Sequence, residues 1–320
     1  MHQEFKELNG MPIAFNELTV RKEHVKKIII EHPRYKELLE LIKECHLHSV
    51  GSVEPATLFL FGHTGVGKST VLKDHLQNYP RDFKDGKTIV PVLYVTVPVG
   101  ATPKSVASEF LYSLGDPNYD KGTQTSLDKR VYHFIENCGV QLIILDEFQH
   151  LIDRDTKHVL NRASDWLKLL CEQTKVAIIL GGMHECEKIF LHNEQLSRRF
   201  AVREELTSFK YSTREEQKEF RTFLYILDKQ LPFPFQSNLA DSIISEKIYY
   251  VTNGVPSYIK LLIEKSVEHA LKNGQDFIDE GNLYVAFNSI KISKRPKMVN
   301  PFSDEEFNLH EAIEIENRKN

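Results

Sequence analysis

The amino-acid sequence predicts an α/β protein: a parallel sheet covered by helices, followed by a smaller helical unit. The first observation is that short apolar runs alternate with helix-patterned segments through the middle of the chain. The second is a glycine-rich motif between one such run and the next helix. The third is that strand-like runs fade after about residue 206. Alternating strands and helices favour a doubly wound sheet with parallel strands.

Four apolar runs are predicted as strands, because continuous apolar stretches such as 142–145 suit strands that are buried on both faces. The predicted strands are 57–61, 88–97, 140–145 and 176–180. Apolar residues at helical spacing predict the helices, and Asn-Gly pairs at 253–254 and 273–274 predict two of their ends. The predicted helices are 69–78, 104–114, 127–137, 157–174, 215–229, 239–252 and 257–273.

These elements divide the chain into four parts. Residues 1–55 are predicted as an N-terminal helical extension and residues 56–205 as the α/β core. Residues 206–290 are predicted as a helical lid. Residues 291–320 are mostly polar, which predicts a flexible C-terminal tail.

The composition is that of a globular protein, with 41% hydrophobic and 27% charged residues among 320. It excludes a mainly disordered, collagenous or coiled-coil chain.

No apolar run approaches the roughly 20 residues that span a bilayer, and no signal pattern is found, so we expect a cytoplasmic protein without membrane contact. A net charge of −4 argues against a generally basic nucleic-acid coat protein. It does not exclude a local basic surface, because net charge averages over the whole molecule. The cysteines have no metal or redox spacing and are predicted as reduced thiols: Cys45, Cys138, Cys171 and Cys186.

The segment 62–69 matches Gly-x-x-x-x-Gly-Lys-Ser/Thr without deviation and stands between a predicted strand and a predicted helix. Its glycines let backbone amides wrap around phosphate oxygens, and the helix N-terminus adds partial positive charge. Lys68 is expected to contact the β- and γ-phosphates, and Ser69 to bind Mg²⁺. The predicted ATP-binding residues are Gly62, His63, Thr64, Gly65, Val66, Gly67, Lys68, Ser69 and Thr70.

Asp146 and Glu147 end the most apolar predicted strand, at the edge where α/β sheets bind ligands. Asp146 is expected to bind Mg²⁺ with Ser69, and Glu147 to orient and deprotonate the attacking water. A small-molecule kinase supplies its own acceptor and does not need the second carboxylate, so the pair favours an ATP hydrolase. The alternative is an acidic pair that merely caps the following helix.

The order of phosphate loop, Asp-Glu strand and helical lid resembles that of AAA+ ATPases, which are P-loop NTPases. In that family an arginine near the segment 196–200 acts as a finger on a neighbouring subunit, and Arg199 and then Arg198 are the candidates here. The alternative is a surface ion pair.

Ser257 stands where the family usually has the sensor 2 arginine, with Lys260 one turn later. Sensor 1 is often an Asn or Thr at the end of the fourth strand in that family, but Gly181 and Gly182 stand there in this sequence. Thr96 is a candidate polar partner for Glu147, and the alternative for it is an ordinary strand threonine.

A closer resemblance is to the TniB/TnsC-like transposition regulators, relatives of the IstB helper ATPases. It is carried by Asp146-Glu147-Phe148-Gln149-His150 and by the segments 161–168, 181–185 and 195–200, with His32-Pro33-Arg34-Tyr35 near the start. The resemblance covers residues 20–290. It implies a slow, regulatory ATPase that forms a ring or helical oligomer on duplex DNA. Such a protein couples target-site selection, by a TniQ-like or TnsD-like selector, to recruitment of a DDE transposase.

The same resemblance places DNA-facing contacts after the second strand and before the third. The candidates are Lys104, Lys121, Thr123 and Arg154, which would contact the phosphate backbone without base readout. The alternative for each is a solvated side chain on a surface loop. Repetition of a few charges around an oligomer would reconcile such contacts with the net charge of −4.

Three other functions are weighed against this one. The first is a different ATP-dependent DNA helper or loader of the IstB type. The second is a nucleotide-sensing signalling switch of the STAND type that does not bind DNA. A metabolic kinase comes last, because the lid is helical and no acceptor pocket is visible.

Overall fold

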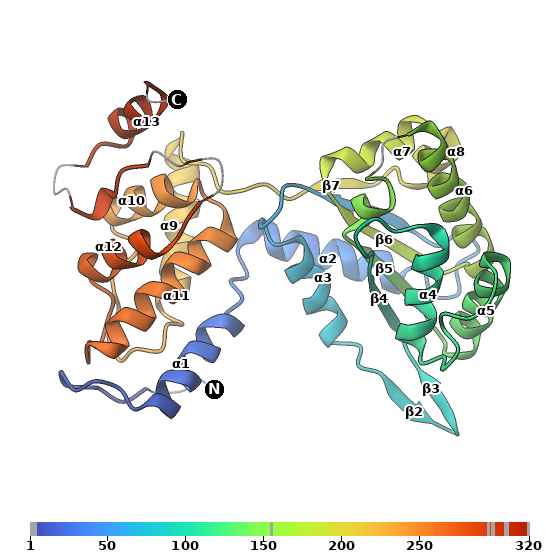
Figure 1. Ribbon diagram of the computed structural model, residues 1–320, viewed down its shortest axis with the longest axis horizontal. Helices are drawn as coiled ribbons and strands as arrows, with labels where there is room; N and C mark the ends of the chain where they lie inside the picture. The colour runs from blue at the N-terminus through green and yellow to red at the C-terminus, as the bar shows by residue number, and fades with distance from the viewer. Residues whose placement is uncertain (1–4, 154–155, 293–294, 296–297, 304–306, 319–320) are drawn as a thin grey trace. The chain divides into compact units, whose positions relative to one another are not determined.

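The computed structural model describes residues 5–153, 156–292, 295, 298–303 and 307–318. The chain divides into two compact units (Figure 1). One is Pro33–Thr207, an α/β unit, and the other consists of the described parts of Met1–His32 and Ser208–Asn320, which are helical. The segment 1–55 is therefore shared between the units: α1 (Phe15–Lys27) belongs to the helical unit and α2 (Pro33–Leu47) to the α/β unit.

Five parallel strands form the central sheet, in the order β4-β5-β6-β1-β7. Every residue of β5 and of β6 is buried, as the apolar runs predicted. The predicted parallel α/β fold is confirmed, and the strand before the phosphate loop, β1, lies between β6 and β7. The strands are β1 (Thr57–Phe61), β4 (Val92–Thr96), β5 (Leu142–Asp146), β6 (Ala177–Gly182) and β7 (Arg203–Glu205).

The strand predicted over 88–97 is interrupted. Its first part is β3 (Lys87–Ile89), which pairs with β2 (Asp82–Lys84) in a separate antiparallel hairpin. Pro91 lies at the break and has no N–H to donate to a strand ladder. β7 was not predicted, because three residues of sequence Arg-Glu-Glu carry no apolar signal.

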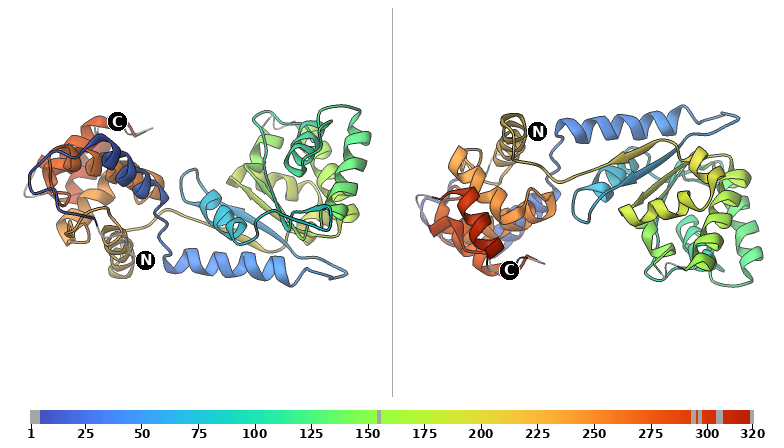
Figure 2. Two further views of the ribbon diagram at one scale, coloured as in Figure 1. Left: turned by 90° about the horizontal axis from the view of Figure 1, so that it is seen from below. Right: turned by 90° about the horizontal axis from the view of Figure 1, so that it is seen from above.

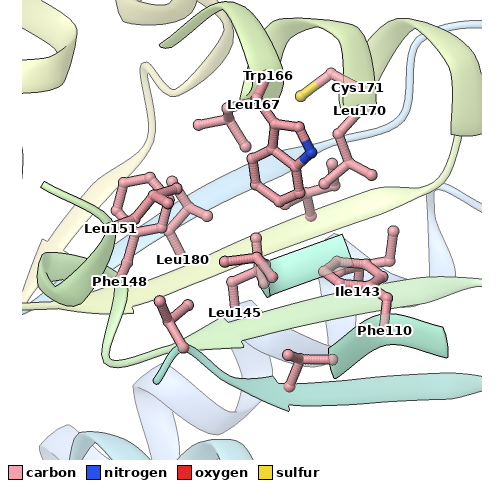
Figure 3. Packing of buried hydrophobic residues seen from close by; sticks show 14 of the residues in the cluster. Phe110, Ile143, Leu145, Phe148, Leu151, Trp166, Leu167, Leu170, Cys171 and Leu180 are labelled. Carbon is pink, nitrogen blue, oxygen red and sulfur yellow. The ribbon is translucent and has the colours of Figure 1, made fainter. Parts of the chain in front are cut away.

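Helices cover both faces of the sheet (Figure 1, Figure 2). α2 and α3 (Lys68–Gln77) lie on one face. The other face carries α4 (Pro103–Leu114), α5 (Gln124–Asn137) and α6 (Lys157–Thr174), with the short α7 (Glu187–Leu191) and α8 (Glu194–Arg199) beyond them. Figure 3 shows the core on this second side, where Trp166, Leu167 and Leu170 of α6 pack over Ile143 and Leu145 of β5.

The helical unit has its own core around α9 (Arg214–Asp228), α10 (Ser242–Thr252) and α11 (Pro256–Lys272). Two further helices, α12 (Glu280–Ser289) and α13 (Leu309–Arg318), were not predicted. Arg21 of α1 is completely buried in this unit and donates to the carbonyl oxygen of Pro232 at 3.0 Å. Arg295, within the segment 291–320, forms an ion pair with Glu316 of α13 at 2.6 Å.

All four cysteines are buried free thiols. Across the part of the chain that the structure describes, no helix is long and apolar enough to cross a membrane. Within that same part, no group of three or more His, Cys, Asp or Glu side chains is arranged to hold a metal ion.

Candidate nucleotide-binding site

The loop 62–69 joins β1 to α3 and has the backbone of a phosphate cradle. Gly62, Gly65 and Gly67 have φ values of 147°, 84° and 110°, which favour glycine. At Gly62 an added Cβ would lie 2.1 Å from the carbonyl oxygen of Leu206. No side chain fits at Gly62, so the residue after β7 holds the loop close to the sheet.

Lys68 begins α3, directly after its N-cap Gly67. Its side chain is buried, and Nζ donates to the carbonyl oxygens of Gly62 at 2.8 Å and His63 at 2.9 Å. Burial lowers the pKa of Lys68, while the nearby Glu147 and Asp146 carboxylates act in the opposite direction. The ammonium group therefore lies inside the loop, within the field of the two carboxylates.

Asp146 lies at the end of β5 and is only 2% exposed. Its Oδ2 accepts a hydrogen bond from the Tyr94 hydroxyl, and its Oδ1 accepts one from the backbone N–H of Glu147 at 2.9 Å. On the neighbouring strand, a Cβ at Gly181 would come within 2.9 Å of Asp146 Oδ1. A side chain at Gly181 would therefore have to displace the Asp146 carboxylate or Leu72.

Glu147 follows Asp146 with a left-handed backbone, φ 58°. Its Oε2 accepts a hydrogen bond from Nε2 of Gln149, two residues later in η1 (Phe148–Leu151). Gln149 is 8% exposed, and its Oε1 is buried without a hydrogen-bond partner. Thr96, the partner considered from the sequence, bonds instead to the Tyr94 hydroxyl. The signal for Gln149 was present in the Asp-Glu-Phe-Gln-His segment but could not show which side chain it contacts.

A second group that the sequence analysis missed lies at the carboxyl ends of β1, β6 and β7. His184 Nε2 is 3.1 Å from Glu205 Oε1. Its ring centroid is 5.1 Å from those of Phe61 and of His63, the second residue of the phosphate loop. The ends of three strands are therefore tied together beside the loop.

The two arginine-finger candidates lie on the surface helix α8. Arg198 is exposed and pairs with Glu194 at 2.6 Å. Arg199 is also exposed, and its side chain contacts Cys171. Among the described residues, no hydrogen bond or ion pair joins either arginine to the loop 62–69 or to Asp146 and Glu147 of the same chain.

The candidates for DNA contact lie on two adjacent connections. Lys104 is exposed in the first turn of α4, whose N-cap is Thr102. Lys121 and Thr123 are exposed before α5, and Thr123 is the N-cap of that helix. The fourth candidate, Arg154, lies outside the described residues.

Arg130 of α5 braces the connection that carries Lys121. It donates to Asp116, at 2.9 Å from Nε, and to the carbonyl oxygens of Asn118 at 2.7 Å and Lys121 at 2.8 Å. Burial would raise the pKa of Asp116, but the bonds from Arg130 and from the Asn118 N–H outweigh it and leave the pKa lowered. The loop is thus held by one charged, hydrogen-bonded side chain.

A small pocket of about 100 Å³ lies between the loop that precedes Lys104 and η1, the short helix after the carboxylate strand. Its walls come from the loop before α4, from η1 and from the start of α6. The lining residues are Gly100, Ala101, Thr102, Pro103, His150, Leu151, Asp153, Val159 and Arg162. The loop before α4 and the short helix that carries Gln149 therefore line the same pocket.

The family model described as "Bacterial TniB protein" matches residues 22–211, more than half of the chain. The chain belongs to the TniB family. This membership confirms the resemblance drawn from the Asp-Glu-Phe-Gln-His and Leu-Ser-Arg-Arg-Phe segments. The matched range includes the phosphate loop, both carboxylates and α8.

Outside the TniB family, this chain is similar to ORC-type proteins. It is 33% identical over 135 residues to ORC1-type DNA replication protein 10 of Halobacterium salinarum, which is 39% of this chain and 32% of that protein. The match thus spans about a third of the length of that curated relative.

Solved structures share the AAA+ P-loop ATPase fold with this TniB-family chain. The Aeropyrum pernix ORC2 protein, in ADPNP–ADP complexes, has a TM-score of 0.59 at 14% identity, covering 97% of this chain and 75% of that one. The Aeropyrum pernix ORC1 protein, in complex with DNA, has a TM-score of 0.57 at 16% identity, covering 83% and 66%. Drosophila ORC bound to DNA has a TM-score of 0.51 at 12% identity, covering 93% and 73%.

Proposed function

We propose that this protein is an ATPase that assembles with ATP on duplex DNA and couples target-site selection to recruitment of a DDE transposase. The observation that supports the ATPase part is the buried Lys68 within its glycine loop. Its ammonium group is close enough to the Asp146 and Glu147 carboxylates for their charges to act on it. Membership of the TniB family and the DNA complexes of ORC1 and Drosophila ORC support the DNA part. The transposase and a TniQ-like or TnsD-like selector are the partners that TniB/TnsC resemblance implies.

In the proposed reaction, the loop 62–70 holds the triphosphate and Lys68 balances charge on its β- and γ-phosphates. Glu147 accepts a proton from the attacking water as the water oxygen bonds to the γ-phosphorus and the bond to the bridging oxygen breaks. ADP and phosphate leave. The Ser69 hydroxyl and the buried Asp146 carboxylate have the hard oxygen donors that Mg²⁺ prefers, and the ion would supply charge neutralisation at the phosphates.

The self-assembly part rests on Arg198 and Arg199. Both are exposed and unconnected to the site of their own chain among the described residues, so either can act on a neighbouring subunit. A guanidinium group there would stabilise charge on the transferring phosphoryl group. Turnover would then depend on assembly, as expected of a slow, regulatory ATPase whose product is a change of oligomeric state.

The pocket between the loop before Lys104 and η1 suggests how DNA binding would influence ATP hydrolysis. A backbone phosphate bound at Lys104 would act on the loop before α4, which lines the same pocket as η1. η1 carries Gln149, which donates a hydrogen bond to Glu147. Contacts of this kind give affinity without base readout.

A second candidate is an ATP-dependent DNA loader of the IstB or replication-initiator type. The 33% identity to an ORC1-type replication protein favours it, over 39% of the chain. Both candidates require DNA binding, whereas a STAND-like signalling switch does not.

The test is electron microscopy of the protein with duplex DNA and either ATP or a non-hydrolysable analogue. We expect nucleotide-dependent rings or filaments on DNA, and no assembly by Lys68→Ala, which should lose nucleotide binding. The absence of DNA association in every nucleotide state would eliminate the transposition and loader functions together. Co-sedimentation of these assemblies with a DDE transposase separates the two, since a loader would retain a replicative helicase instead.

A further inference from the structure

The exposed surface of α9 is divided by charge. Arg214, Lys218, Arg221 and Lys229 follow one another at spacings of four, three and eight residues, which places them on one side of a helix. Tyr225 lies on the same side, four residues after Arg221. The exposed acidic residues Glu215 and Glu219 are offset from this side by about a quarter turn or more. We call the four cations and Tyr225 the α9 basic stripe.

The cations of the stripe have no acidic partners in the described part of the chain, although all four are exposed. Elsewhere in the same unit, cations are commonly paired with carboxylates. Lys22, Lys265 and Lys272 all lie within 4.0 Å of Glu268, and Arg295 pairs with Glu316. The chain has a net charge of −4, so a row of four cations without paired carboxylates differs from the rest of its surface. It costs repulsion between like charges that an anionic ligand would relieve.

The stripe borders a groove of about 460 Å³. Arg221 Nε donates to the carbonyl oxygen of Ala240 at 2.7 Å, which anchors the guanidinium at the groove wall and leaves its other nitrogens available. Lys229 lies over the ring of Tyr225, with Nζ 4.2 Å from the centroid. The wall contains no carboxylate; it is formed by Arg214, Gln217, Lys218, Arg221, Thr222, Tyr225 and Ala240.

We propose that the α9 groove binds the phosphate backbone of duplex DNA, as a second contact beyond the loops that carry Lys104 and Lys121. The proposal rests on the proposed function only in taking duplex DNA as the ligand. Arg214 and Arg221 are seven residues apart, about 10 Å along a helix axis. The same length of duplex carries about three phosphates on one strand.

The lining favours a polynucleotide over an acidic protein partner. Stable protein interfaces centre on buried aromatic or aliphatic anchors in well-packed pockets. The groove has no such anchor site: its least polar lining residues are Ala240 and the exposed Tyr225, and the remainder are charged or amide and hydroxyl side chains. Arginine, lysine, glutamine, threonine and tyrosine are the residue types that contact DNA phosphates.

The test is the salt dependence of binding to a labelled duplex of about 30 base pairs, measured by fluorescence anisotropy with a non-hydrolysable ATP analogue. The groove variant combines Arg214→Gln, Lys218→Gln and Arg221→Gln. Each lost phosphate contact should reduce the slope of log K against log salt by about 0.9. We expect a reduction of about two to three in the slope and at least about a tenfold loss of affinity at low salt.

The matched control combines Lys26→Gln, Lys265→Gln and Lys272→Gln, which removes the same charge from surface positions of the same unit. It should keep the slope of the unaltered protein, and both variants should keep their circular dichroism spectrum and their affinity for a fluorescent ATP analogue. Equal slopes and affinities for the groove variant and the control would overturn the proposal.

Two further outcomes separate this proposal from the proposed function. Loss of DNA binding in Lys104→Gln/Lys121→Gln, with none in the groove variant, would leave the proposed function standing and remove the groove from it. Absence of DNA binding by the unaltered protein would overturn both. Binding of labelled poly-glutamate by the unaltered protein more tightly than the duplex at equal charge concentration, with loss of that binding in the groove variant, would identify an acidic protein partner instead.

Discussion

At the scale of single residues, the site is organised around oxygen atoms that are already hydrogen-bonded. Asp146 accepts from Tyr94 and from the N–H of Glu147, and Glu147 accepts from Gln149. Hydrogen bonds to carboxylates are among the stronger ones in proteins and restrict the rotamers of both partners. Gly181 contributes by leaving room, since a side chain there would press on Asp146.

Replacement of the proposed base is the most direct test of the chemistry. We expect Glu147→Gln to bind ATP normally. Its rate of phosphate release should fall by at least about a hundredfold, since a general base contributes 10²–10⁴-fold. Assemblies on DNA should persist longer, because hydrolysis would no longer loosen them. The measurements are steady-state phosphate release and the lifetime of DNA-bound assemblies. Unchanged turnover would remove Glu147 from this role.

Gln149 is predicted to be a positioning residue for Glu147. Gln149→Leu keeps the volume but removes the donor to Glu147 Oε2. Because a hydrogen bond to a charged group contributes about 1.5–3 kcal/mol, we expect turnover to fall by about 10- to 100-fold while ATP affinity stays the same. Gln149→Glu, which cannot donate when ionised, should be no better. A variant that hydrolyses as fast as the unaltered protein would contradict this prediction, and changed ATP affinity would indicate a structural effect instead.

At the scale of elements, α2 and α3 meet through a buried histidine pair. His46 Nδ1 and His75 Nε2 are 3.1 Å apart, and His75 Nδ1 is buried without a hydrogen-bond partner. Burial lowers the pKa of His75 to about 4, helped by His46 and Lys43 and opposed by Asp74. His75 lies on the helix that begins with Lys68, so its protonation bears on the helix behind the phosphate loop.

The pair predicts acid sensitivity of the α/β unit. The folded pKa of about 4 lies below the usual histidine value of 6.5, so the neutral ring stabilises the fold above pH 6.5. This contribution is lost as the pH falls from 6.5 through 4. It amounts to roughly 3 kcal/mol, from 1.36 kcal/mol per unit. Urea unfolding at pH 7.5 and pH 4 should show this loss in the unaltered protein and a loss smaller by about that amount in His75→Gln. Equal losses would refute the assignment.

At the scale of the whole molecule, we propose that an arginine of a neighbouring subunit completes the reaction. Arg199 and Arg198 are exposed on α8, and within the described residues neither is bonded to the nucleotide loop or the carboxylates of its own chain. The same exposure would be unremarkable for surface arginines, and Arg198 already has Glu194 as a partner. Arg199 is therefore the better candidate for action on a neighbouring subunit.

Removal of each arginine separately distinguishes them. Arg199→Ala should keep ATP binding by the monomer and reduce DNA-stimulated turnover by about 10³-fold, the lower end of the effect of an arginine finger. Arg198→Ala is the control: it loses only an exposed ion pair, worth at most about 1 kcal/mol, and should retain turnover. The readouts are fluorescent-nucleotide binding and phosphate release with and without DNA. The opposite pattern would assign the finger to Arg198, and no effect from either would exclude a finger on α8.

The sequence by itself determined what depends on neighbouring residues along the chain. The phosphate loop, the Asp-Glu strand end and the buried strands of the sheet are local patterns, and the Asp-Glu-Phe-Gln-His segment predicted the TniB family. The tertiary structure decided contacts between distant residues. It assigned α1 and α2 to different units and added the polar edge strand β7. It also chose Gln149 over Thr96 as the partner of Glu147, and it gives the α9 basic stripe no acidic partner among the described residues. Spacing along a chain sets which face of a helix or strand a residue occupies, whereas its partner depends on what packs against that face.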